Sequence, residues 1–145
     1  MDIKFKKLNR KASLPIYGTI GSAGADLRAC IESSIIIESG RVAIISTGVA
    51  IELPFGFFGM LCPRSGLASK NGITLLNSPG ILDTDYRGEI KILMINHSDA
   101  PFTVEHGVRI AQLIIIPFEK GNWIKAKSLT GTLRAENGFG STGTK

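Results

Sequence analysis

The chain has 145 residues and a mass of 15.5 kDa, the size of one ordinary domain. It contains 43% hydrophobic and 20% charged residues, and no apolar run approaches the roughly 18 residues of a membrane span, which excludes a disordered tail protein and a transmembrane protein. The net charge of +5 suggests an anionic partner but does not separate nucleic acid from phosphorylated metabolites. The N-terminal residues do not resemble a secretion signal, so we expect a cytoplasmic protein.

Short β-branched runs separated by turn residues predict an all-β chain. Helical periodicity is nearly absent, and we expect one short helix around residues 65–70. Strands at this spacing favour a sandwich, a barrel or a jelly roll. Polar alternation is weak in the last two runs, which predicts coverage on both faces, by a second sheet or by another copy of the chain. The runs are 34–37, 42–46, 49–53, 90–95 and 109–117.

Residues 62–67 (CPRSGL) follow a predicted strand and open the predicted helix. Free N–H groups at a helix start, together with the Arg64 guanidinium and the Ser65 hydroxyl, would make an anion site. A strand-to-helix turn with a capping serine fits the same letters equally well.

Residues 77–89 (NSPGILDTDYRGE) form the densest polar segment of the chain. An exposed Asp83 beside Tyr86 could orient a water for attack and accept its proton. Two turns carrying solvated charges would explain the segment as well. Asp83 and Asp85 could also bind magnesium together with phosphates. The residues alone leave these alternatives open.

Three further features stand out. Gln112 is an uncharged amide inside the most apolar run, and a buried glutamine needs a hydrogen-bond partner. Cys30 and Cys62 lack metal-site spacing, and we interpret both as reduced, buried thiols. After Leu133 the composition shifts to glycine and small polar residues, which is typical of a frayed tail but also of an arm that closes over a ligand.

Together and in order, five segments resemble the motifs of the homotrimeric dUTPase family. They are GSAGADL (21–27), PRSGL (63–67), NSPGILDTDYRGE (77–89), GVRIAQLI (107–114) and RAENGFGSTG (134–143). The resemblance implies a jelly-roll-like β-barrel subunit (residues 1–133) of a homotrimer, with a flexible Gly-rich arm (residues 134–145) closing over active sites between subunits. It implies a dUTP diphosphatase that hydrolyses dUTP to dUMP and pyrophosphate with Mg²⁺. That reaction supplies dUMP for thymidylate synthesis and keeps uracil out of DNA.

The resemblance also implies residue roles. Asp83 would orient the attacking water, and Tyr86 would lie under the deoxyribose, too close for a ribose 2′-hydroxyl. Asp26 would act on Mg²⁺ through water, while triphosphate oxygens provide most of the direct ligands. Uracil would be bound by Asn77, Gly80, Ile81 and Leu82. The phosphates would be bound by Gln112 and by Arg64, Ser65 and Gly66 of a neighbouring subunit. Lys91 would lie near the ligand.

In the arm, the resemblance implies that Phe139 stacks on uracil. It implies that Arg134, Ser141 and Thr142 grip the γ-phosphate, with Gly140 beside them. Two glycines of the usual family motif are replaced here, by Ala135 and Asn137. Ala135 would cost about 1 kcal/mol or more only if its position needs a positive φ.

Three other functions compete with this interpretation. A dCTP deaminase would share the fold but would need a different base pocket. A catalytically dead nucleotide-binding module would be free to lose Asp83, Tyr86 and Arg64. A nucleic-acid binder is the weakest of these alternatives, because it would carry aromatic residues repeatedly interleaved with its basic ones. We therefore expect dUTP as the substrate and no nucleic-acid or membrane partner.

Overall fold

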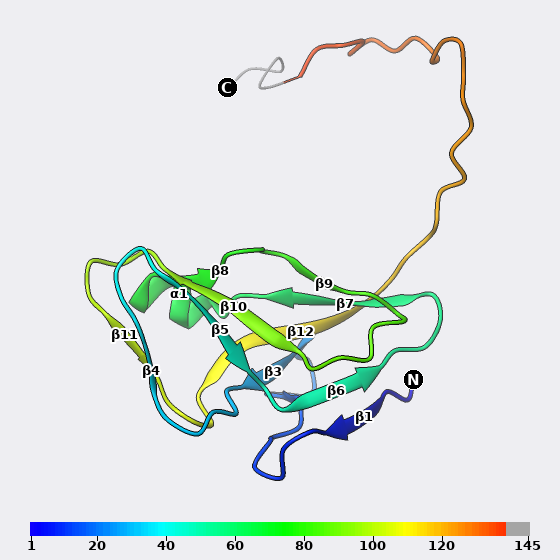
Figure 1. The fold of residues 1–145 in the computed structure, drawn as a ribbon. Helices are drawn as coiled ribbons and strands as arrows, with labels where there is room; N and C mark the ends of the chain where they lie inside the picture. Colours follow the sequence, from blue (N-terminus) through cyan, green and yellow to red (C-terminus); the bar gives the residue numbers. More distant parts are fainter. Residues whose placement is uncertain (139–145) are drawn as a thin grey trace.

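The computed structural model describes residues 1–138 as short antiparallel strands with one short helix (Figure 1). The mostly-β class predicted from the sequence is therefore confirmed. The elements are β1 (Lys4–Lys7), β2 (Ile16–Tyr17), β3 (Gly24–Arg28), β4 (Ile35–Ile37), β5 (Val42–Ser46), β6 (Val49–Glu52), β7 (Phe57–Cys62), α1 (Ser65–Asn71), β8 (Ile73–Leu75), β9 (Gly80–Leu82), β10 (Lys91–Asn96), β11 (Phe102–Val104) and β12 (Arg109–Pro117).

The strands form four sheets. The largest has the order β2-β3-β12-β7-β9, and β12 runs through its centre. A second sheet has the order β5-β10-β8, and two-stranded ribbons join β1 to β6 and β4 to β11. Over residues 1–138 these ladders do not close into a barrel, so the barrel part of the fold prediction rests on the resemblance alone.

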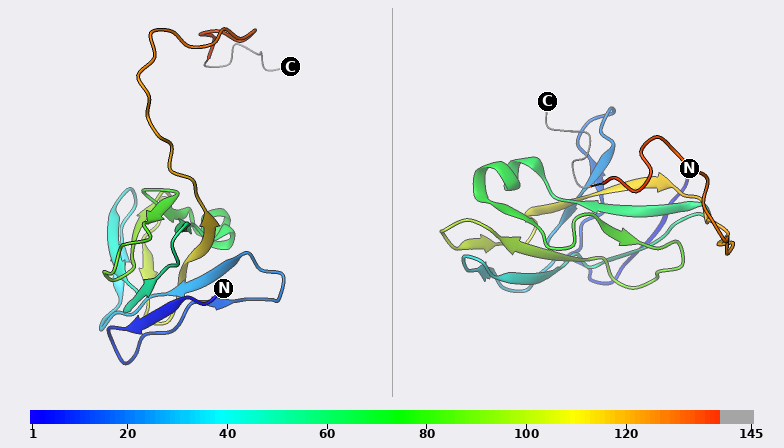
Figure 2. Two further views of the ribbon diagram at one scale, coloured as in Figure 1. Left: turned by 90° about the vertical axis from the view of Figure 1, so that its right-hand side faces the viewer. Right: turned by 90° about the horizontal axis from the view of Figure 1, so that it is seen from above.

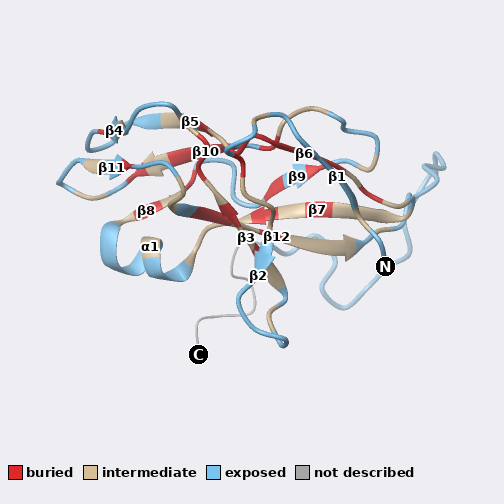
Figure 3. Cartoon of the chain, turned by 90° about the horizontal axis from the view of Figure 1, so that it is seen from below, coloured by how far each residue is buried: buried red, intermediate tan, exposed pale blue. Residues whose placement is uncertain are grey.

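The hydrophobic core lies between the sheets. Alternation places Ala25 and Leu27 of β3 inside, with Asp26 between them on the outer face. In β10, Ile92 and Met94 are fully buried, while Leu93 and Ile95 face outward and are only half-buried. Figure 3 shows buried residues gathered where β3, β10 and β12 cross, with α1 and β2 exposed. Within one copy, β10 is thus covered on one face, and the predicted second cover is not part of this chain's own fold.

Helix α1 occupies the position that the sequence predicts. It has Arg64 as its N-cap residue, without a side-chain capping bond, so the capping serine considered above is not what starts it. It ends at Gly72, whose φ of 64° is left-handed. In the part of the chain that the structure describes, no helix has the length and apolar character needed to cross a membrane.

The chain leaves the sheets after β12. Phe118 makes the last contacts with the body: its N–H donates to the Gly56 carbonyl, and its ring packs edge-on against Phe58 at 6.3 Å. Residues 119–138 then run away from the sheets without strand or helix, as Figures 1 and 2 show. Large apolar side chains stand exposed along this stretch: Trp123, Ile124, Leu129 and Leu133.

Candidate functional site

The polar segment after β9 is a loop that three sets of hydrogen bonds hold in shape. Strand β9 pairs with β7, which places buried Leu82 opposite Gly59 and delivers Asp83 to the surface. The Thr84 hydroxyl donates to the Phe57 carbonyl at 2.6 Å. The Arg87 guanidinium folds back onto the Thr84 carbonyl at 2.7 Å. The loop therefore presents its exposed Asp83 and Tyr86 on a backbone anchored at several points.

This loop forms one wall of a pocket of about 220 Å³. The pocket brings together six of the residues predicted from the sequence: Asn77, Ile81, Leu82, Asp83, Tyr86 and Lys91. Gly80 lies just behind its wall, buried and paired with Leu61. Glu89, to which the sequence analysis gave no role, also lines the pocket.

A second pocket, of about 320 Å³, lies on the outer face of the five-stranded sheet. It is lined by Asp26, Arg64, Ser65, Gly66 and Gln112, the residues predicted to hold phosphates and metal. Sheet register makes this possible, because Asp26, Gln112 and Cys62 pair side by side across β3, β12 and β7. Gln112 and Cys62 are therefore half-buried on the outer face, and the expectation that both are buried is wrong.

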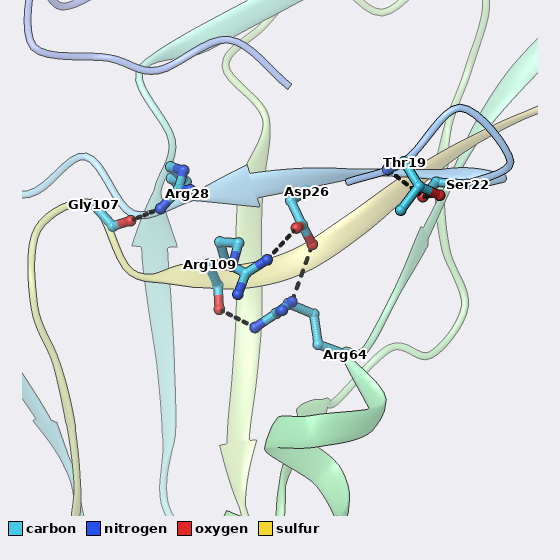
Figure 4. A network of polar contacts seen from close by, with 7 residues as sticks. All are labelled: Thr19, Ser22, Asp26, Arg28, Arg64, Gly107 and Arg109. Atoms are coloured by element: carbon cyan, nitrogen blue, oxygen red, sulfur yellow. Dashed lines mark hydrogen bonds and ion pairs between the residues drawn. The ribbon is translucent and has the colours of Figure 1, made fainter. Parts of the chain in front are cut away.

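An ion-pair network occupies this second pocket (Figure 4). The two Asp26 carboxylate oxygens accept from Arg64 Nε and from Arg109 Nη1, each at 3.0 Å. The Asp26 side chain is 16% exposed, so both bonds are partly shielded from solvent. Arg64 reaches Asp26 from the start of α1, and Arg109 comes from the first residue of β12. Arg109 was not predicted; its only sequence signal is a basic residue inside the fourth motif.

Asp26 is a single carboxylate, and the described residues contain no group of three or more His, Cys, Asp or Glu side chains that could hold a metal ion. This donor set fits Mg²⁺ only if triphosphate oxygens and water fill most of its coordination sphere. Asp26 would then contact the ion's water shell. A metal held by the protein alone does not fit.

The two pockets share no lining residue within the described part of the chain. The second pocket, the phosphate-type pocket, is thus a separate pocket from that of Asp83 on this chain.

The only clear pKa shifts in residues 1–138 fall outside these pockets. Burial raises the pKa of the Cys30 thiol, and the Glu89 and Glu32 carboxylates add to that shift. A hydrogen bond from Lys4 lowers the pKa of the Glu52 carboxyl.

The start of the predicted arm forms a small turn. Arg134 Nε donates to the Asn137 carbonyl at 3.0 Å. Arg134 lines neither of the two pockets. Ala135 has a φ of 45°, the conformation in which an alanine costs about 1–2 kcal/mol. The other predicted arm residues, Phe139, Gly140, Ser141 and Thr142, lie outside the described residues.

Comparisons with known proteins agree with these motifs. The dUTPase family model matches residues 10–143. A deoxyuridine 5'-triphosphate nucleotidohydrolase of Hydrogenobaculum sp. (strain Y04AAS1) is 49% identical over 145 residues, covering 100% of both chains. One of the same name from Rickettsia felis is 52% identical over 142 residues, covering 97% of this chain and 96% of the relative.

Among solved structures, the dUTPase of Staphylococcus bacteriophage 80alpha with dUPNHPP superimposes with a TM-score of 0.91 at 26% identity, covering 99% of each chain. The similarity to these proteins extends over the whole chain and all the motifs described above. This chain belongs to the dUTPase family.

Proposed function

We propose that this protein is a dUTP diphosphatase, which hydrolyses dUTP to dUMP and pyrophosphate. The observation that carries the proposal is the pocket that brings residues of the segment 77–82 together with Asp83 and Tyr86. Membership of the dUTPase family and relatives named deoxyuridine 5'-triphosphate nucleotidohydrolase support it. The reaction would supply dUMP for thymidylate synthesis and keep uracil out of DNA.

In this proposal Asp83 is the catalytic residue. Its exposed carboxylate lies in the same pocket as Tyr86, where it can orient a water toward the α-phosphate and take the proton as the water attacks. Breaking the α–β phosphoanhydride then releases pyrophosphate. Tyr86 would lie under the deoxyribose. The segment 77–82 would bind uracil too closely to admit the methyl group of thymine, which would be rejected by steric clash.

The phosphates would be held by Arg64, Ser65 and Gly66 of a neighbouring subunit, with Gln112 on the α-phosphate and Lys91 near the ligand. This arrangement is supported by the lack of any shared lining residue between the two pockets on one copy, because the phosphate residues and Asp83 then form two separate parts of a site. The phosphates would compete with Asp26 for the Arg64 guanidinium. Bound Mg²⁺ would neutralise phosphate charge, and Asp26 would contact its water shell.

A homotrimer of jelly-roll-like subunits would bring the phosphate-type pocket of one copy to the Asp83 pocket of another. The support is an apolar outer face on the β5-β10-β8 sheet, where Val42 pairs with Ile95 and Ile44 pairs with Leu93. Ile44 is 62% exposed and lies in this contiguous apolar patch, and exposed apolar patches mark interaction sites. Lys91 continues the same row into the Asp83 pocket, so a neighbouring copy on this face would reach that pocket.

The arm, residues 134–145, would close over the nucleotide of another subunit. Phe139 would stack on uracil, and Arg134, Gly140, Ser141 and Thr142 would contact the γ-phosphate end. The exposed apolar side chains between Trp123 and Leu133 support a partner for this part of the chain, because they find no cover on their own subunit. A cytoplasmic location, without a nucleic-acid or membrane partner, belongs to the same proposal and is based on the sequence alone.

The test is pyrophosphate release by the purified protein with Mg²⁺, comparing dUTP with dTTP, dCTP and UTP. Release from dUTP alone is the expected result. Ammonia from dCTP would instead indicate a deaminase. Tight dUTP binding without turnover would indicate a binding module.

A further inference from the structure

Glu89 lines the Asp83 pocket, yet its carboxylate is directed to the protein rather than to solvent. One oxygen, Oε1, accepts from the Gly48 N–H at 2.8 Å. The other, Oε2, lies 3.8 Å from the Lys91 ammonium. The Glu89 side chain is only 20% exposed, against 55% for Lys91, so it is not an ordinary surface charge.

The donor on the other side of this bond is rigidly held. Gly48 forms the turn between β5 and β6 with a φ of 67°, and a Cβ there would lie 2.8 Å from the Ala12 Cβ. Two further bonds join the same turn to residue 90: the Thr47 hydroxyl donates to the Ile90 carbonyl at 2.6 Å, and the Ile90 N–H donates to the Val49 carbonyl at 2.8 Å. These two bonds and the tight packing at Gly48 hold the turn in place. The turn can therefore anchor the end of the loop that carries Asp83 and Tyr86.

Tyr86 is attached to that same end of the loop. Its hydroxyl donates to the Glu89 backbone carbonyl at 2.9 Å. Its ring lies over Gly88, where any Cβ would collide with the tyrosine hydroxyl. The position of the Tyr86 ring thus follows the position of the Glu89 backbone.

We propose that Glu89 is a positioning residue. By accepting a hydrogen bond from the Gly48 N–H it anchors the loop, and the anchored loop fixes the position of the Tyr86 ring in the pocket. This rests on the proposed function, in which Tyr86 lies under the sugar. Anchored by Glu89, the ring stays close enough to the sugar to exclude a ribose 2′-hydroxyl. Glu89 touches neither substrate nor metal in this role, and its effect falls on the choice between dUTP and UTP.

The decisive comparison is between Glu89→Ala and Glu89→Gln. Glutamine keeps an oxygen that can accept from the Gly48 N–H, whereas alanine removes it. We expect Glu89→Ala to lower the ratio of kcat/KM for dUTP over UTP by about tenfold, the effect of one lost hydrogen bond, and Glu89→Gln to keep most of the preference. Glu32→Gln is the matched control, because it removes one carboxylate charge at an exposed site paired with Lys11.

Two further measurements test the same anchor, and the first of them does not require Glu89→Ala to fold. Tyr86→Phe removes the hydroxyl anchor without touching Glu89, and it should lower the same ratio. The chain has two tyrosines, so ring NMR of the protein without nucleotide can follow Tyr86 with Tyr17 as internal reference. In Glu89→Ala the Tyr86 ring signals should shift while those of Tyr17 stay.

The proposal is overturned if Glu89→Gln is as unselective as Glu89→Ala, or if Tyr86→Phe keeps the full preference. Unchanged Tyr86 ring signals in a folded Glu89→Ala protein would also overturn it. Failure of the wild-type protein to hydrolyse dUTP is a separate result that would refute the proposed function, and the ring signals still report the anchoring in that case.

Discussion

Asp83 is exposed, while the residues around it are tied to the sheet, so its replacement should change chemistry without changing the fold. We predict that Asp83→Asn keeps nucleotide affinity within a few-fold and lowers kcat by about 10²- to 10⁴-fold, the usual contribution of a general base. Pyrophosphate release and calorimetric binding measure the two quantities. Asp85→Asn, an exposed acid two positions along the same loop, is the control and should stay active. A fast Asp83→Asn enzyme would show that another group orients the water.

Asp26 separates two guanidinium groups, from Arg64 and Arg109. Asp26→Asn keeps the shape but removes the charge that both arginines face, so the free energy of unfolding should fall by about 1–3 kcal/mol. The Mg²⁺ concentration needed for half-maximal activity should rise in the same variant. Urea unfolding and a Mg²⁺ titration test these points, with Asp99→Asn, an exposed acid outside both pockets, as control. Unchanged values in both assays would contradict the metal role and the pairing.

The sequence predicted six of the eight residues that line the Asp83 pocket and five of the ten that line the phosphate-type pocket. It gave no role to Glu89, or to Arg109, which pairs with Asp26. Asp26, Arg64 and Asp83 were predicted because they lie in segments that resemble the motifs of the family. Arg109 and Glu89 act on other protein groups, and a basic or acidic residue near a strand end is most often a solvated charge. Only the register of β3 against β12 brings Arg109 to Asp26.

At the scale of elements, the position of α1 depends on a buried amide. Asn96 is fully buried and its Nδ2 donates to the Ile37 and Ala100 carbonyls, while its Oδ1 accepts from the Ser98 N–H and hydroxyl. The next residue, His97, donates its N–H to the carbonyl of Gly72, where α1 ends. Asn96 therefore holds the loop against the end of the helix whose start lines the phosphate-type pocket.

We predict that Asn96→Ala lowers the free energy of unfolding by about 3 kcal/mol, because it removes a fully buried side chain and takes the Asn96 partner from the buried Ile37 carbonyl and the partly buried Ser98 N–H. Chemical denaturation of the full chain measures the change. Asn71→Ala, at the exposed end of the same helix, should change stability by less than about 0.5 kcal/mol. Equal stability of the two variants would argue against a structural role for the amide network.

The sequence predicted the long apolar strands well: β5 and β12 begin and end where the letter pattern places them. It predicted no run for β3, β8, β9 or β11. It also missed β1 and β2, which are short and exposed along their whole length. Strand β1 carries the sequence KFKK and pairs with β6, more than 40 positions away. Such a strand exists because a partner edge is available, and local hydrophobic periodicity carries no sign of that partner.

At the scale of the whole molecule, the outer face of the β5-β10-β8 sheet predicts self-association. We predict that Ile44→Lys weakens the proposed trimer, because it would forfeit about 1.5–3 kcal/mol of apolar burial per subunit and introduce three like charges. Sedimentation measures the mass in solution. Ile36→Lys changes an isoleucine of similar exposure, 60% against 62%, on the β4–β11 ribbon and should leave the mass unchanged. An Ile44→Lys protein of wild-type mass would place the interface elsewhere.

A chain ending at Leu133 tests the arm on the same scale. It keeps all strands and both pockets, so it should fold and assemble as the full protein does. We predict that its kcat/KM for dUTP falls by at least about tenfold, since the arm would supply stacking and charge contacts to the bound nucleotide. Undiminished kcat/KM in the shortened chain would show that residues 134–145 are only a tail.

The amino-acid sequence by itself predicted the mostly-β class, the short helix and the residue types of the candidate site. It could do so because turn residues, β-branched runs and motifs are local signals. The tertiary structure decided how those residues meet. Asp26 is 38 positions from Arg64 and 83 from Arg109, and Gly48 is 41 from Glu89. Contacts over such separations depend on which strands pair and in which register, a property of the assembled sheets that no local segment encodes.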